Sequence, residues 1–141
     1  MSFKFAAAVA MAALLTAGAA RAEIVHFAAT LTGGEEVPPN ASAGKGELSA
    51  ELETTEKTLA YRATYTGLSG PAVAAHFHGP AAPGENAPPV VMIKNPASPI
   101  GGAVLLSNDE AADLLAGKWY FNVHTQANPG GEIRGQLKRL N

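Results

Sequence analysis

Residues 75–80 read Ala75-His76-Phe77-His78-Gly79-Pro80, a stretch that sets two histidines two residues apart and ends in a Gly-Pro turn signal. Side chains on an extended strand alternate between its two faces. His76 and His78 therefore point the same way, and Phe77 points the opposite way. The stretch predicts a β-strand with one apolar face and one face that carries imidazoles.

A second stretch, Trp119-Tyr120-Phe121-Asn122-Val123-His124-Thr125, alternates in the same manner. Its apolar face holds the residues at 119, 121 and 123, and His124 lies on the opposite face with Tyr120 and Asn122. Three of the four histidines thus lie on strand faces turned away from the aromatic residues of their own strands. Simple burial of a core does not predict that arrangement.

Outward from these two stretches, short apolar or alternating runs are separated by Gly, Pro and Asn about every ten residues. One segment is helical in character, because Ser107 and Glu110 have the spacing of a capping box ahead of residues 109–116. Many short strands with one short helix predict an all-β fold, an antiparallel Greek-key β-sandwich or barrel. The predicted strands are residues 24–31, 46–53, 59–66, 73–78, 90–94, 103–106, 119–126 and 131–140, and the predicted core includes Tyr65, Phe77, Trp119, Phe121, Ile133 and Leu137.

The N-terminal segment, residues 1–22, has the features of a signal peptide. Lys4 precedes an apolar run, and Ala20-Arg21-Ala22 has the small-x-small form of a cleavage site. The run is too short to span a bilayer, and no second long apolar segment follows it. We expect cleavage after Ala22, no membrane anchor after cleavage, and one mature domain over residues 23–141, exported to the periplasm or secreted.

Composition excludes several classes of partner. The 10 Lys and Arg residues include Lys4 and Arg21, and without these two, 8 basic residues face 12 acidic ones, a net charge of −4 for residues 23–141. No basic stripe exists, so we expect neither nucleic acid nor an anionic membrane surface as a partner. The chain has no cysteine, which excludes disulfides and a lipoprotein anchor.

The histidines are the candidate ligand residues. Imidazole binds copper, zinc, iron and nickel, and two strands can present three imidazoles to one ion. The sequence suggests a metal site formed by His76, His78 and His124, with His26 as a fourth ligand if the first strand lies beside the other two. The alternative is structural, with His76 and His78 holding the Gly79-Pro80 turn through hydrogen bonds to the backbone.

Other polar residues give weaker signals. Arg134 falls on an outward strand face, where an arginine usually forms an exposed ion pair of little energy, although it can also guide an anion toward the histidines. Glu35 and Glu36 follow two glycines in a loop, where carboxylates usually face water and sometimes bind a cation. No Ser-His-Asp order, phosphate loop or paired catalytic carboxylates are present, so we expect no enzyme.

Three motifs in order resemble the CHRD (chordin) domain family. They are residues 31–39, Leu-Thr-Gly-Gly-Glu-Glu-Val-Pro-Pro; residues 75–80, quoted above; and residues 122–135, which include Asn128-Pro129-Gly130-Gly131-Glu132-Ile133-Arg134-Gly135. CHRD domains occur in chordin, an extracellular antagonist of growth factors, and in many exported bacterial proteins. The resemblance implies an exported β-rich domain and does not by itself supply an activity.

A second, partial likeness is to Cu/Zn superoxide dismutase, a β-sandwich with a His-x-His strand that binds copper. His76 and His78 match that motif, and His124 stands in the place of a third ligand from a late strand. That enzyme needs more histidines than the four present here, and its disulfide needs cysteine. A zinc-bridged dismutase site therefore cannot be built from this chain.

Two hypotheses from different classes follow. The first is an exported, non-enzymatic binding or scaffold module of CHRD type that contacts an envelope or extracellular protein. The second is a periplasmic or secreted metal-binding protein, with copper as the expected ion, that uses His76, His78 and His124.

Overall fold

The computed structural model of this chain describes residue 18 and residues 21–141. The predicted signal peptide lies almost wholly outside the described residues, and it stays a prediction. The elements are the strands β1 (Ile24–Thr32), β2 (Lys45–Glu53), β3 (Thr58–Thr66), β4 (Ala72–His78), β5 (Pro89–Met92), β6 (Ile100–Leu105), β7 (Tyr120–Thr125), β8 (Ile133–Gln136) and β9 (Lys138–Arg139), the 3₁₀ helix η1 (Gly33–Glu35) and the helix α1 (Asn108–Leu115).

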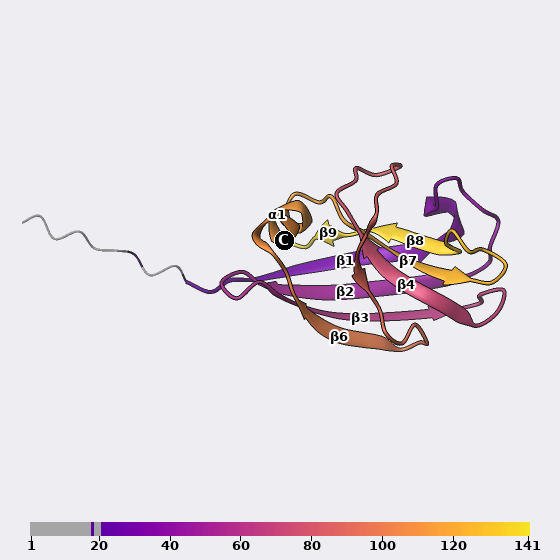
Figure 1. The fold of residues 1–141 in the computed structure, drawn as a ribbon, viewed down its shortest axis with the longest axis horizontal. Coiled ribbons are helices and arrows are strands. Elements are labelled where there is room, and N and C mark those ends of the chain that lie inside the picture. Colours follow the sequence, from indigo (N-terminus) through magenta and orange to yellow (C-terminus); the bar gives the residue numbers. More distant parts are fainter. Residues whose placement is uncertain (1–17, 19–20) are drawn as a thin grey trace, which may run out of the picture.

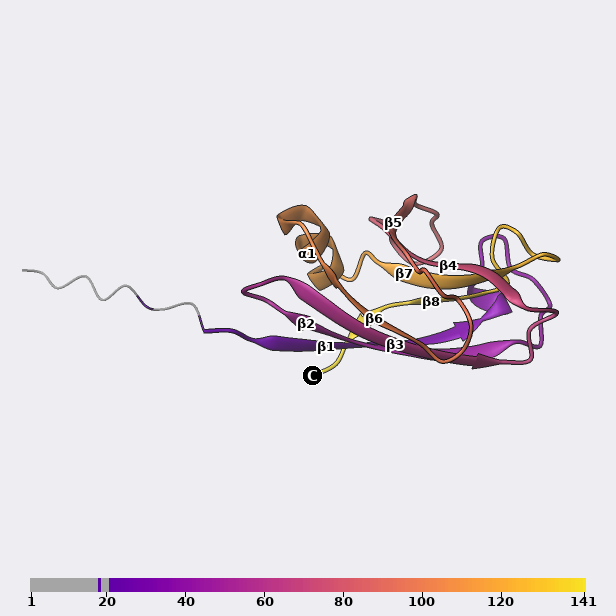
Figure 2. The ribbon, with the colours of Figure 1, turned by 60° about the horizontal axis from the view of Figure 1, so that its bottom comes forward.

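The strands form one antiparallel sheet that curls into a nearly closed barrel, in the order β5-β4-β7-β8-β1-β2-β3-β6, with β9 paired to β1. Figure 2 shows the two layers that result, with β1, β2 and β3 in one and β4, β7 and β8 in the other. Neighbours such as β3 and β6 are far apart in sequence, as in a Greek key. The predicted fold class is confirmed.

The long hairpin of β2 and β3 follows from clean alternation. Leu48, Ala50 and Leu52 are buried, and the residues between them face outward. Lys45 pairs with Thr66 at one end of the ladder and Glu53 with Thr58 at the other. A slip by one residue would expose every one of these apolar side chains, which fixes the register.

The core lies between the two layers and is centred on the aromatic residues of β4 and β7. Phe77 packs edge-on against Phe121, with ring centroids 4.9 Å apart, and Trp119 is fully buried beside them. Five of the six predicted core residues are buried. Tyr65 is only partly buried, because its hydroxyl donates to the Pro96 carbonyl 2.7 Å away.

The last predicted strand, residues 131–140, is two strands in the structure. β8 lies between β7 and β1 and pairs with both, whereas β9 pairs with β1 alone. Between them, Leu137 N–H donates to the Trp119 carbonyl at 3.0 Å, and its side chain is buried.

Helix α1 begins where the capping box predicts. Ser107 Oγ accepts from Glu110 N–H at 3.1 Å, and Glu110 Oε2 accepts from Ser107 N–H at 2.8 Å. Ala111 and Leu114 are its buried residues, and the helix lies at the end of the barrel where β1 begins (Figure 1).

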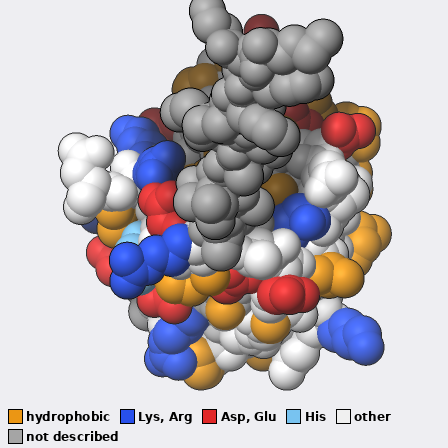
Figure 3. Space-filling model, turned by 90° about the vertical axis from the view of Figure 1, so that its left-hand side faces the viewer, with side chains coloured by type: hydrophobic (Ala, Val, Ile, Leu, Met, Phe, Trp, Pro, Cys, Tyr) orange, Lys and Arg blue, Asp and Glu red, His pale blue; other side chains and the backbone are white. Residues whose placement is uncertain are grey.

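Charges of both signs are interspersed on the visible surface at that end (Figure 3). Within the described residues, no helix combines the length and apolar character needed to cross a membrane.

Candidate metal centre

Strands β4 and β7 bring the predicted histidines onto one face of the sheet. His76 pairs directly with Asn122, His78 with Tyr120, and Ala74 with His124. Because cross-strand partners share a face, the polar faces of the two strands merge into one. Phe77 and Phe121 are paired on the opposite, core face, as the alternation predicted.

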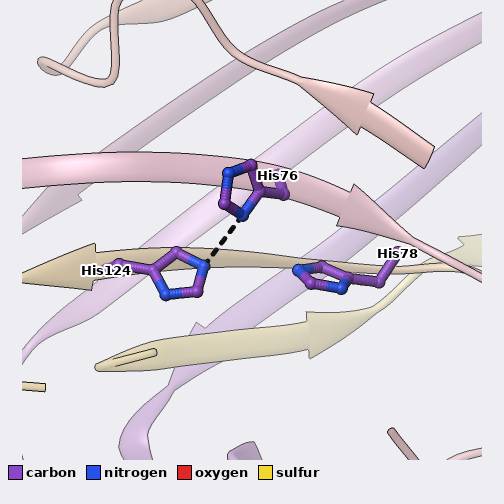
Figure 4. Close-up of side chains that lie close together, drawn as sticks. All are labelled: His76, His78 and His124. Atoms are coloured by element: carbon purple, nitrogen blue, oxygen red, sulfur yellow. Dashed lines mark hydrogen bonds between the residues drawn. The ribbon is translucent and has the colours of Figure 1, made fainter. Parts of the chain in front are cut away.

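The three imidazoles converge (Figure 4). His76 Nδ1 lies 3.0 Å from His124 Nε2, and one ring nitrogen from each of His76, His78 and His124 lies within 4.8 Å of the other two. His78 and His124 are buried, and His76 is half-buried. This is a group of nitrogen donors close enough to share one ion after small side-chain rotations.

Two backbone carbonyls orient two of the three rings. His124 Nδ1–H donates to the Pro129 carbonyl at 2.9 Å, and His78 Nδ1–H donates to the Ala87 carbonyl at 2.8 Å. With the proton held on Nδ1, His124 turns its Nε2 toward His76 Nδ1 at 3.0 Å, whereas the Nε2 of His78 contacts Asn122 Oδ1 at 3.0 Å. Histidines that bind metals are usually held in this way by a hydrogen bond at the other ring nitrogen.

The third ring, His76, donates from Nδ1 to His124 Nε2 in the neutral state, because the His124 proton is on Nδ1. Among the described residues, no hydrogen bond to His76 Nε2 is present. A shift of the His76 proton to Nε2 would free Nδ1 as a ligand. His76 therefore fits the site in one of its two neutral tautomers.

The environment favours the neutral forms of His76 and His78. Burial lowers the pKa of His76, and the neighbouring His124 and His78 lower it further. Burial also lowers the pKa of His78, although its hydrogen bonds to Ala87 and Asn122 oppose that shift. A neutral imidazole is the form that binds a metal, so the lowered pKa values of His76 and His78 favour coordination by these two rings at neutral pH.

A family model for the CHRD domain matches residues 27–137. The chain belongs to the CHRD domain family. The resemblance drawn from the three sequence motifs is thereby confirmed. No curated protein and no solved structure matches the chain.

The loop between β4 and β5 of this CHRD domain covers the His78 side of the cluster. Tyr120 stacks on the His78 ring, with centroids 4.6 Å apart and planes 5° apart. The Tyr120 hydroxyl also donates to the Ala87 carbonyl and accepts from the Ala87 N–H. Tyr120 thus fixes the position of the carbonyl that orients His78.

The interpretation of Arg134 as an exposed sheet residue is wrong. Its side chain is 2 % exposed, and no ion pair involves it among the described residues. The guanidinium lies 3.5 Å above the Tyr120 ring, donates to Asn86 Oδ1 at 2.8 Å and also donates to the Glu85 carbonyl. Arg134 therefore anchors the covering loop.

The two loop carboxylates differ. Glu35 faces water as predicted, but Glu36 is 6 % exposed. Burial raises the pKa of Glu36 to about 7, although Arg134 and the Asn122 amide offset part of the rise. No local sequence pattern distinguishes the two carboxylates, because both residues lie in the same polar loop.

His26 is not brought to the cluster. It lies on β1, its side chain is 54 % exposed, and its Nδ1 is 3.3 Å from Glu51 Oε1 on β2. Sheet order places β8 between β1 and the strand that carries His124. The condition for a fourth histidine ligand, a first strand beside the other two, is not met.

Asn122 was seen on the polar face, but its role was missed. Its Oδ1 lies 3.0 Å from His78 Nε2. On β7, Asn122 is paired with His76 of β4 on one side and with Arg134 of β8 on the other. A metal that takes His78 Nε2 as a ligand must displace this contact. The alternation places Asn122 on the correct face, and only the strand pairing places it against His78.

Proposed function

We propose that this CHRD domain is an exported, non-enzymatic binding module and that His76, His78 and His124 bind a transition-metal ion, with copper as the expected ion. The observation that carries the proposal is the pair of backbone carbonyls that hold the Nδ1 protons of His78 and His124. They hold His124 Nε2 toward His76 and His78 Nε2 toward Asn122, and one ring nitrogen from each of the three histidines lies within 4.8 Å of the other two. A purely structural role needs no such convergence of three imidazoles.

The ligand set favours a borderline ion. Three imidazoles suit copper, zinc and nickel, and copper forms the strongest complexes of the divalent series. Binding requires that Asn122 release His78 Nε2 and that the His76 proton leave Nδ1. Both changes are side-chain events, so the strands need not move.

The binding-module part of the proposal rests on the family and on the surface. CHRD membership supports a domain that binds or scaffolds other molecules of the envelope or extracellular space. A groove of about 680 Å³ on the outer face of β1–β3 is lined by residues of mixed polarity, and none of the three histidines lines it.

Copper titration of matched histidine variants tests the proposal. The apo protein is expected to bind one Cu(II), with nitrogen hyperfine structure in the electron paramagnetic resonance spectrum. His76→Ala, His78→Ala and His124→Ala should each weaken binding by about tenfold or more, the loss of one good ligand. His26→Ala is the matched control and should bind as the wild type does, because His26 lies outside the cluster.

If His124→Ala binds copper as tightly as the wild type, the two strands do not share an ion and the metal proposal fails. A CHRD module that contacts a protein partner is then the remaining candidate. If binding is lost, copper should also raise the melting temperature of the wild type, because a ligand bound only to the native state stabilises it.

A further inference from the structure

Strand β5 flanks the histidine cluster and ends in a methionine. In the β4–β5 ladder, Met92 is paired directly with His76, and Val91 is paired with Phe77. Val91 and Phe77 are both buried on the core side. Because directly opposed residues share a face, the Met92 side chain lies on the same outer face as the His76 imidazole.

The pairing geometry brings these two side chains close. Ile93 N–H donates to the Ala75 carbonyl at 3.0 Å, which makes that pair a hydrogen-bonded one. Hydrogen-bonded and non-hydrogen-bonded pairs alternate, so His76 and Met92 form a non-hydrogen-bonded pair, the type whose Cα atoms are only about 4.5 Å apart. With three flexible torsions beyond Cα, the Met92 thioether can reach the region of the His76 ring.

The exposure of Met92 is also informative. Met92 is 66 % exposed, whereas Val91, the partner of Phe77 in the same ladder, is buried. An exposed apolar residue needs no explanation by itself. One placed directly opposite a histidine of a three-imidazole cluster supplies a soft sulfur donor where nitrogen donors already converge.

We propose that Met92 Sδ is the fourth ligand of the histidine site and that the site thereby favours Cu(I). Thioether sulfur is a soft donor that selects Cu(I), whereas three imidazoles alone also suit Zn(II) and Cu(II). This inference rests on the proposed function and gives the oxidation state of the ion that the site prefers.

The sulfur content of the chain makes the proposal testable by spectroscopy. The chain has three methionines, Met1, Met11 and Met92, and no cysteine. Met92 is the one sulfur atom in the described residues 21–141. A copper–sulfur scattering path that disappears in Met92→Leu therefore belongs to Met92, because the other two methionines remain in that variant.

The test loads the full chain anaerobically with one equivalent of Cu(I) and measures affinity by competition with a coloured Cu(I) chelator. Met92→Leu keeps the size and exposure of the side chain but removes the sulfur. We expect it to weaken Cu(I) binding by about tenfold or more, to change Cu(II) binding by less than about threefold, and to abolish the sulfur path in X-ray absorption.

A relocated methionine is the control. Leu105 on β6 is 71 % exposed, so Met92→Leu combined with Leu105→Met restores the number of methionines at a distant surface position. This double variant should bind Cu(I) as weakly as Met92→Leu. Recovery of tight binding would show that any surface thioether suffices and would overturn the assignment.

The remaining outcomes separate the two proposals. If the wild type binds neither Cu(I) nor Cu(II), the proposed function itself fails. If the wild type binds copper through the histidines but Met92→Leu binds Cu(I) equally well and no sulfur path is seen, the three-histidine site stands and the Met92 ligand is refuted.

Discussion

At the scale of single residues, the burial of Glu36 is the feature most open to measurement. Glu36 follows η1 as its C-cap residue, its Oε1 has no hydrogen-bond partner, and burial raises its pKa to about 7. Gly131 lies directly against it with a φ of +126°, and a Cβ there would collide with Glu36 Oε1. A buried acid of this kind makes stability depend on pH.

The sign of the dependence follows from the two pKa values. Between the unfolded value of 4.5 and the folded value of about 7, the native state binds a proton that the unfolded chain has lost. The free energy of unfolding therefore falls as pH rises through this window. Glu36→Gln is a neutral mimic of the protonated form and removes this dependence. We therefore expect the change that Glu36→Gln makes in the free energy of unfolding to be more stabilising at pH 8 than at pH 4.5, by on the order of 2 kcal/mol.

Urea unfolding of the wild type and Glu36→Gln at the two pH values measures this difference. Glu35→Gln is the matched control, since Glu35 is exposed in the same loop and its substitution should give nearly the same change at both pH values. An identical pH profile for Glu36→Gln and the wild type would contradict a buried, protonated Glu36.

At the scale of the element, strand β7 joins the core to the histidine site. One face holds Phe121 and Val123, both fully buried, and the other holds Asn122 and His124. The strand is buried on both faces because the barrel covers one and the loops around residues 80–89 and 129–131 cover the other. The polar face of β7 is therefore kept largely out of water. The same burial lowers the pKa of His78 on the neighbouring strand β4.

Truncation of the core face tests this assignment. Trp119→Ala and Phe121→Ala should each lower the free energy of unfolding by about 3–5 kcal/mol, since both side chains are fully buried. Chemical denaturation monitored by circular dichroism gives the values. A loss under about 1 kcal/mol at both positions, small for any buried aromatic, would mean that the faces of β7 are reversed and that His124 does not face the cluster.

At the scale of the whole molecule, protons from the solvent and a bound metal ion compete for the same lone pairs of the imidazole nitrogens. Burial lowers the pKa of His76 and His78, so protons displace a metal only below the ordinary value of 6.5. We expect copper affinity to be nearly constant between pH 8 and 7. It should fall below pH 6.5, by up to about tenfold per pH unit for each imidazole that must lose a proton.

Copper competition titrations at pH 8, 7, 6 and 5 measure this profile. A midpoint above 6.5 would contradict buried, neutral rings. The His26→Ala variant should give the same profile as the wild type, because His26 is outside the cluster and half-exposed on β1.

Export is the other property of the whole molecule. The predicted cleavage after Ala22 lies just ahead of β1, which begins at Ile24, so processing would remove no element of the barrel. The intact mass of the protein recovered from the envelope or the medium should correspond to residues 23–141. A soluble cytoplasmic protein that retains residues 1–22 would contradict both export and the interpretation of the N-terminal segment.

Much of the fold could be predicted because its signals are local. The period of two in residues 75–78 and 119–125 separates the imidazoles from Phe77 and Phe121 before any partner strand is known. The capping box likewise marks the start of α1 within four residues of chain. Such signals depend on the geometry of one strand or one turn, and the structure retains them.

The composition of the site was decided by tertiary structure. Which strands are neighbours determines that His124 joins His76 and His78, that His26 does not, and that Met92 stands opposite His76. The covering loops decide that Arg134 and Glu36 are buried rather than solvated. A strand's alternation fixes which side chains share a face, but pairing and burial come from contacts between segments far apart in the chain, which no local pattern records.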